Sequence, residues 1–236
     1  MKKWIAQASG LLFVCAMAMP TTAAEAPKAY LPQELATEMA KLPAGDMKAG
    51  EAVHNQKFCS GCHGKDGLSQ NPAWPNVAGQ PREVTVKALL DYRSGRRANG
   101  AAMMMAGVAK TLSDREISDV AAYYEAVDGG KGQKEEAQID ADIKRMITRG
   151  DAKRTITPCA TCHGMTAQGN PTGQVPVLQG QNAAYMAATL RDYRSGARSS
   201  DILKEMRFFA SKLTDKEIDQ LTGYYASLRG HQPKDN

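Results

Sequence analysis

The sequence predicts an all-α protein built from two copies of one small helical domain. Several short sequence patterns recur about one hundred residues later in the chain. The apolar residues between these patterns follow helical spacing. No segment shows the alternation of apolar and polar residues that is typical of a half-buried strand. With 236 residues, the chain is long enough for two such domains, each with its own core.

The repeat consists of six pairs of matching stretches. Two pairs have an offset of 100 residues and the four that follow have an offset of 101, so the second copy contains one net insertion between positions 163 and 180. The matching stretches are GEA at 50–52 with GDA at 150–152, CSGCHG at 59–64 with CATCHG at 159–164, GQ at 79–80 with 180–181, DYRSG at 91–95 with 192–196, LSDREI at 112–117 with LTDKEI at 213–218, and YY at 123–124 with 224–225.

The repeat and the composition divide the chain into five parts. Lys2 and Lys3 precede a short apolar run that ends in small residues, which is typical of a cleaved secretory signal peptide. A stretch rich in glycine and charged residues separates the two copies, as expected of a linker. The predicted parts are a signal peptide at 1–24, an N-terminal extension at 25–45, a first domain at 46–128, a linker at 129–136 and a second domain at 137–236.

The strongest helix signals lie at the end of each copy. Ser113 with Glu116, and Thr214 with Glu217, form capping boxes that predict the start of a terminal helix. A middle helix is predicted to begin at Pro81 and to end at Gly95, and its counterpart to end at Gly196. Residues at helical spacing that we expect on the buried faces of the terminal helices are Ile117, Val120, Ala121 and Tyr124, then Ile218, Leu221 and Tyr225. We expect Gly50 and Gly150 to allow close helix contacts.

The extension and a few further residues lie outside this pattern. Leu35, Met39 and Leu42 have helical spacing, and we expect the extension to pack as a strap on the first domain, with docking of a partner as the alternative. His54 and His231 are expected to be solvated surface residues.

Four cysteines remain once the predicted signal peptide is removed, and they form two C-x-x-C-H motifs. This motif attaches c-type haem, because the two thiols add to the haem vinyl groups and the adjacent histidine binds one axial face of the iron. The predicted attachment residues are Cys59 and Cys62 with His63, and Cys159 and Cys162 with His163. Two small disulfide loops or a zinc site are the alternatives, but zinc needs four ligands in one tetrahedron and a spacing that the chain lacks.

A haem iron with one histidine needs a second axial ligand if it is to be a pure electron carrier. The first copy offers Met103, Met104 and Met105, and the first copy alone does not decide among them. The second copy has one methionine in the matching segment, Met206, and the offset of 101 pairs it with Met105. A thioether ligand favours ferrous iron and blocks access of substrate. The alternative is that both are ordinary core methionines.

The motifs together resemble those of the dihaem cytochrome c4 family, which consists of tandem class I cytochrome c domains. The resemblance rests on CSGCHGKDG, NPAWPNVAGQ, MAGVAKTLSD and AAYY with their second-copy partners, and it covers the chain from about Asp46 onward. It implies two covalently attached haem c groups whose edges face each other across a domain interface. It also implies that backbone carbonyls of Pro75 and Pro176 orient the two histidines. Arg97 and Arg198 are candidates to pair with haem propionates, with solvated arginines as the alternative.

The expected function is single-electron transfer in the periplasm without catalysis. The resemblance implies a quinol-oxidising cytochrome complex as donor and a terminal oxidase as acceptor. A second interpretation is the haem subunit of a periplasmic dehydrogenase that oxidises sulfur compounds or sulfide. A haem enzyme such as a peroxidase is a third, although the paired methionines argue against it. The formal charge falls from +5 to +3 without the signal peptide and no basic tract is clustered, so nucleic acid is not an expected partner.

The two copies differ near the second methionine. Phe208 and Phe209 stand where the first copy has Gly107 and Val108. We therefore expect bulkier and drier surroundings on the methionine side of the second haem. Burial disfavours the charged ferric state, so the two reduction potentials are expected to be unequal.

Overall fold

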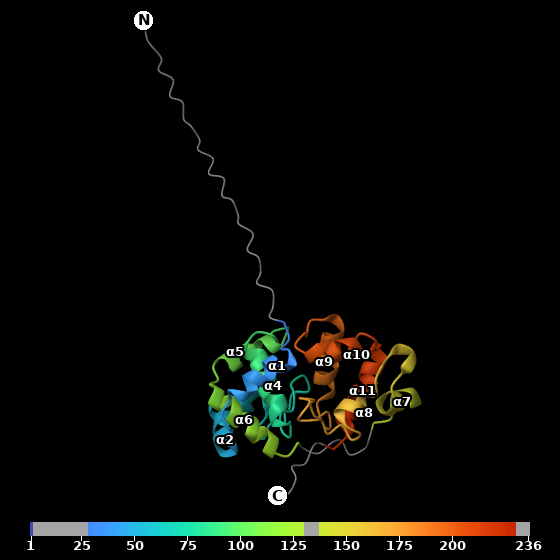
Figure 1. Cartoon of the computed structure of the whole chain (residues 1–236), viewed down its shortest axis with the longest axis horizontal. Helices are drawn as coiled ribbons and strands as arrows, with labels where there is room; N and C mark the ends of the chain where they lie inside the picture. Colours follow the sequence, from blue (N-terminus) through green and yellow to red (C-terminus); the bar gives the residue numbers. More distant parts are fainter. Residues whose placement is uncertain (2–27, 130–136, 230–236) are drawn as a thin grey trace.

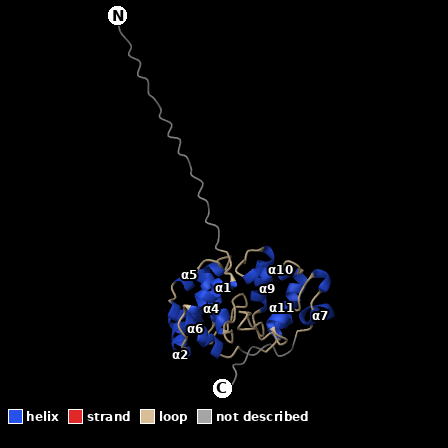
Figure 2. Cartoon of the chain, in the orientation of Figure 1, coloured by secondary structure: helices blue, strands red, loops and turns tan. Residues whose placement is uncertain are grey.

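The computed structural model of the chain describes Met1 and residues 28–129 and 137–229. Residues 2–24 of the predicted signal peptide, residues 130–136 of the predicted linker, and His231 lie outside the described residues. The described part contains helices and loops, with two isolated β-bridges and no strand, as Figure 2 shows. The predicted all-α fold is therefore confirmed. No helix in the described part is both long and apolar enough to span a membrane.

The helices form two lobes that follow the order of the chain (Figure 1). The first lobe contains α1 (Pro32–Ala40), α2 (Met47–Gln56), α3 (Cys59–His63), α4 (Arg82–Arg93), α5 (Ala102–Lys110) and α6 (Asp114–Ala126). The second lobe contains α7 (Ala141–Arg149), the 3-10 turn η1 (Ala152–Arg154), α8 (Cys159–His163), α9 (Ala183–Ser195), the 3-10 turn η2 (Ile202–Lys204), α10 (Glu205–Ala210) and α11 (Asp215–Ser227). Irregular loops from both lobes meet between them (Figure 1).

The core of the first lobe is built on the crossing of α2 and α6. Gly50 lies at this crossing, and a Cβ atom built on it would overlap the carbonyl oxygen of Asp119 in α6. The backbones of the two helices therefore approach as closely as only glycine allows. Both predicted capping boxes are present, and Ser113 and Thr214 accept hydrogen bonds from the backbone N–H groups of Glu116 and Glu217. The faces predicted to be buried on α6 and α11 are buried.

The second lobe differs at the residue that matches Gly50. Gly150 ends α7 with a φ of 74°, whereas Gly50 lies inside α2. Its expected role in close helix contact is therefore wrong, and it serves as a helix C-cap. The chain after Gly150 does not continue as a long helix, and Pro158 could not lie in the interior of one. The two matching glycines therefore have different backbone conformations.

The N-terminal extension packs against the first lobe through α1. Leu35 is 2 % exposed and belongs to the core cluster of this lobe, with Met39 and Leu42 packed against the same cluster. Tyr30 is also buried, and the guanidinium carbon of Arg96 lies 3.7 Å from the centre of its ring. The extension is therefore a strap on the first lobe.

Two glutamines hold the lobes together in a reciprocal pattern. Gln80 donates from Nε2 to the carbonyl of Val177 at 3.0 Å and accepts the backbone N–H of Val177 at 3.1 Å. Gln181 makes the same pair of bonds with Asn76, both at 2.8 Å. Gln80 matches Gln181, and Asn76 matches Val177, at the offset of 101. The interface therefore has approximate two-fold symmetry, and we call these four residues the glutamine clamp.

We expect the double variant Q80A/Q181A to uncouple the lobes. Each substitution removes two hydrogen bonds and leaves backbone groups without partners, at a cost of about 1–3 kcal/mol per site. Calorimetry should then resolve two unfolding transitions in place of one joint transition. The exposed Gln33 provides the control, and Q33A should leave the profile unchanged. A single, unshifted transition in Q80A/Q181A would show that the clamp does not hold the lobes together.

Candidate functional site

The two short helices α3 and α8 carry the C-x-x-C-H residues. All four cysteines are free thiols in the structure, so neither pair forms a disulfide. Among the described residues, no group of three or more histidine, cysteine or acidic side chains could hold a bare metal ion. The alternatives of disulfide loops and a zinc site therefore find no support in the described part of the chain.

Each histidine of the motif is oriented by a proline carbonyl from the loop that follows. Nδ1 of His63 lies 2.9 Å from the carbonyl oxygen of Pro75, and Nδ1 of His163 lies 3.0 Å from that of Pro176. A carbonyl only accepts, so Nδ1 carries the hydrogen and Nε2 keeps its lone pair for a metal. Burial lowers the pKa of both imidazoles, although the hydrogen bonds to the prolines act in the opposite direction.

The proline loops also connect the two sites to the interface. Asn76 follows Pro75 and Val177 follows Pro176, and both are held by the glutamine clamp. Each histidine is thus tied, through one carbonyl and one peptide bond, to a side chain of the opposite lobe. Asn182 adds a bond from Nδ2 to the carbonyl of Trp74 at 2.7 Å.

A tyrosine at the end of each copy reaches the first cysteine of its motif. The hydroxyls of Tyr124 and Tyr225 lie close enough to the thiols of Cys59 and Cys159 to affect the pKa of each thiol. Burial raises the pKa of both thiols, and the nearby tyrosine hydroxyls partly offset the rise.

The three methionines of the first copy differ in exposure. Met103 and Met104 are 65 % and 57 % exposed, whereas Met105 is half-buried and packs against the core of its lobe. Met206 is also half-buried, at the start of α10. Of the three, only Met105 is turned toward the interior.

The segment before Met206 has a backbone conformation that the matching segment of the first copy does not have. Leu203 and Lys204 have φ values of 53° and 62°, in the left-handed region, whereas the matching residues lie within α5. Of the two phenylalanines that we expected to make the surroundings of the second methionine bulkier and drier, Phe208 is 48 % exposed, with Lys212 over its ring. Phe209 does pack against the core of the second lobe.

Two arginines at the interface have buried groups that the described protein atoms leave unsatisfied. Arg97 is 7 % exposed, and within the described residues the Nε atoms of Arg97 and Arg198 have no hydrogen-bond partner. Arg97 Nη2 donates to the hydroxyl of Tyr185 at 3.2 Å. Burial raises the pKa of Tyr185, but both guanidiniums outweigh it and lower that pKa to about 7. A buried and a half-buried guanidinium, each with a buried free donor, together suit an anion.

These features fit haem. Each lobe supplies two thiols for vinyl addition and an imidazole with a free Nε2. A half-buried methionine and, at the interface, an arginine donor suited to a propionate complete each set. A hollow of 330 Å³ lies beside Cys62, with Gly64 and Trp74 among its lining residues.

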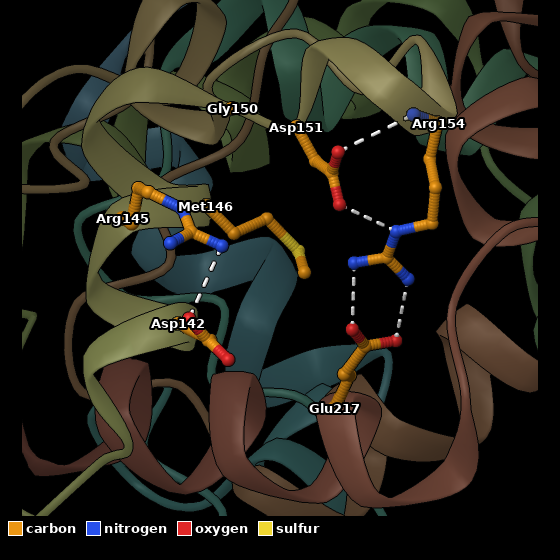
Figure 3. A pocket seen from close by; sticks show the side chains of 7 residues that line it. All are labelled: Asp142, Arg145, Met146, Gly150, Asp151, Arg154 and Glu217. Atoms are coloured by element: carbon orange, nitrogen blue, oxygen red, sulfur yellow. Dashed lines mark hydrogen bonds and ion pairs between the residues drawn. The ribbon is translucent and has the colours of Figure 1, made fainter.

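A separate hollow of 140 Å³ in the second lobe is lined by ion-paired side chains (Figure 3). Arg154 donates from Nε to Asp151 at 2.7 Å and binds Glu217 through both terminal nitrogens at 2.7 and 3.1 Å. Burial is slight here, and these bonds raise the pKa of Arg154 and lower those of Asp151 and Glu217.

One expectation about the site neighbourhood is wrong. His54 is fully buried in α2, not solvated, and its ring contacts Tyr123 and Tyr124. The signal was present in the sequence, because Gly50, Val53 and His54 have the helical spacing of one buried face. The glutamine clamp was also missed, although the recurrence of GQ marked both of its glutamines.

Two haem-attachment motifs on a two-domain helical chain define a dihaem c-type cytochrome. The sequence pattern of the cytochrome c family matches residues 47–128 and 147–229. Cytochrome c4 of Pseudomonas aeruginosa is 33 % identical over 186 residues, which cover 78 % of this chain and 90 % of that protein. The chain belongs to the cytochrome c4 family, carries two covalently attached haem c groups and is an electron carrier.

Two further comparisons bear on fold and role. The crystal structure of reduced recombinant cytochrome c4 from Pseudomonas stutzeri matches with a TM-score of 0.69 at 32 % identity, over 78 % of this chain and all of that one. The thiosulfate dehydrogenase electron acceptor of Thiomonas intermedia is 33 % identical over 174 residues, covering 72 % of this chain and 77 % of that protein. The predicted fold of two tandem cytochrome c domains is thus confirmed.

Proposed function

We propose that this cytochrome carries single electrons between respiratory proteins in the periplasm, with His63 and Met105 as axial ligands in the first domain and His163 and Met206 in the second. The observation that carries the proposal is the inward turn of Met105 beside two exposed methionines. Cys59, Cys62, Cys159 and Cys162 are the proposed attachment residues.

The bound haem supplies an iron that cycles between the ferrous and ferric states. The chain's own residues would limit the rearrangement that accompanies this change, because the proline carbonyls fix the two imidazoles that would hold the iron and the thioethers of Met105 and Met206 would serve as its further ligands. The glutamine clamp holds the two proline loops against each other, which keeps the two sites at a fixed separation. The proposed role is therefore a carrier and not an enzyme.

The proposed partners are a quinol-oxidising cytochrome complex as donor and a terminal oxidase as acceptor. A second candidate function is to accept electrons from a dehydrogenase that oxidises sulfur compounds. The similarity to the thiosulfate dehydrogenase electron acceptor of Thiomonas intermedia supports this candidate. Stopped-flow mixing of the oxidised protein with a purified thiosulfate dehydrogenase plus thiosulfate distinguishes the two. Rapid haem reduction supports the second candidate, and its absence leaves the first.

An optical experiment tests the axial ligands. Spectra of the oxidised and reduced protein, recorded before and after carbon monoxide, should show two low-spin haems, the ferric methionine-sulfur band and no binding of the gas. One high-spin haem, or one that binds carbon monoxide readily, would contradict methionine ligation and place the enzyme interpretation first.

A further inference from the structure

The two proposed methionine ligands lie on different backbones. Met105 is inside α5, a continuous helix of nine residues that follows the left-handed Gly100, which has a φ of 49°. Met206 is near the start of α10, a helix of six residues, and the chain enters this helix through Leu203 and Lys204, which are both left-handed. Glycine adopts this conformation without strain, whereas two successive residues with side chains do so only when the surrounding structure holds them. The turn before Met206 is therefore strained and needs a restraint.

An ion pair restrains this turn from both of its ends. Oδ1 of Asp201 accepts a hydrogen bond from Nε of Arg207 at 2.6 Å, and Oδ2 accepts the backbone N–H of Arg207 at 2.9 Å. Nη2 of Arg207 donates to the carbonyl oxygen of Ser199 at 3.1 Å. The side chain of Asp201 is 4 % exposed, so water competes little for these bonds. The Asp201–Arg207 pair thus closes the chain into a loop around the strained turn, and Arg207 directly follows Met206.

The pair also provides a cap that α10 otherwise lacks. Lys204 occupies the N-cap position, and its side chain forms no capping hydrogen bond. The carboxylate of Asp201 instead binds the backbone N–H of Arg207 in the first turn, which fixes the direction in which the helix starts. Because Met206 lies in this first turn, the position of its side chain depends on the bond.

The first domain has neither partner of the pair. At the offset of 101, Asp201 matches Gly100 and Arg207 matches Ala106, and neither of these two residues has a polar side chain. Met105 does not need such a pair, because the backbone hydrogen bonds of α5 hold it and a glycine takes the left-handed conformation. The restraint is therefore specific to the second domain.

We infer that Asp201 and Arg207 are positioning residues for the second haem, because they hold the strained turn that keeps the thioether of Met206 at the iron. Without the pair the turn relaxes, the sulfur withdraws with its lone pair, and the sixth position opens to an external ligand. A thioether favours ferrous iron, so the oxidised protein should lose this ligand more readily. The inference rests on the proposed ligation by Met206, and it predicts no change in the first domain.

Imidazole titration of the oxidised full-length holoprotein tests the inference, because imidazole binds at a sixth position that methionine vacates. The two haems are followed separately through assigned haem methyl resonances in NMR, so the first haem is an internal control. D201A should raise the affinity of the second haem for imidazole about tenfold or more, with loss of the methionine-sulfur band of that haem. M206A gives the affinity of a fully open second site.

A matched control in the same lobe is D219A. This variant breaks the exposed ion pair between Asp219 and Arg191, which joins α11 to α9. Exposed pairs contribute little to stability, and this one lies outside the loop that holds Met206. D219A should therefore leave both imidazole affinities unchanged.

Three further variants separate positioning from a general loss of stability. D201N keeps the shape of the side chain and removes its charge, so it should change the affinity in the same direction as D201A with less risk to folding. R207K keeps the charge but lacks the planar fork that reaches Ser199, so its effect should be smaller than that of D201A. In D201A/L203G/K204G the glycines remove the strain from the turn, so part of the resistance to imidazole should return without the pair.

The possible failures are distinguishable. Unchanged affinity of the second haem in D201A and D201N, equal changes at both haems, or no recovery in D201A/L203G/K204G would overturn the inference and leave the proposed function intact. A wild-type protein whose second haem binds imidazole as tightly as M206A would overturn the proposed ligation by Met206, and the inference with it.

Discussion

Replacing Met105 by alanine should open the sixth position of the first haem, so that the reduced protein binds one carbon monoxide per chain. The first potential should fall by roughly 0.1–0.3 V, a part of the about 0.8 V that axial ligands span, because the thioether that favours ferrous iron is lost. Carbon monoxide titration and potentiometry of M105A measure both effects.

The neighbouring methionines provide the control for this result. M103A and M104A remove exposed side chains of the same kind and should bind no carbon monoxide. M206A should repeat the effect of M105A in the second domain. Binding of the gas by M104A but not by M105A would move the ligand assignment to the adjacent residue.

Replacing Gly50 by alanine should destabilise the first domain by about 2–4 kcal/mol, because the new Cβ would overlap the carbonyl oxygen of Asp119 and push α2 away from α6. For a domain of this size the unfolding midpoint should fall by roughly 10–20 °C. Thermal unfolding of the holoprotein, followed by haem absorbance and by circular dichroism, measures the shift.

Gly107 provides a matched control in the same lobe. It lies inside α5, and a Cβ atom at this position would have no neighbouring heavy atom within 4 Å, so G107A should leave the midpoint unchanged or raise it slightly. If G50A were as stable as the parent, the close crossing of α2 and α6 would not be required for folding.

Much of the fold was predictable because its signals are local. A capping box such as Ser113 with Glu116 involves residues three apart, and the C-x-x-C-H motifs lie within one helical turn. The pairing of Met105 with Met206 was also accessible, because internal repetition supplies a second sequence to compare. Exposure of Met103 and Met104 in the structure now agrees with that pairing.

The remaining features depend on long-range geometry. The glutamine clamp depends on how two finished domains pack, and a glutamine at position 80 has the same local pattern whether it faces solvent or a partner. Gly50 and Gly150 show that a matching residue does not guarantee a matching backbone. Gly50 lies within a helix in the first copy, whereas Gly150 ends a helix in the second copy. His54 was missed for a different reason, since a residue type that is usually exposed outweighed a helical spacing that indicated burial.

The glutamine clamp has a consequence for how such a chain could arise. Because matching residues make the same two bonds in both directions, a single domain carrying this surface would be self-complementary, and two copies would make the same four bonds about a two-fold axis. Gene duplication and fusion of such a domain would then preserve an existing interface. Afterwards, each half would be free to diverge away from that surface, as His54 and Arg154 have done.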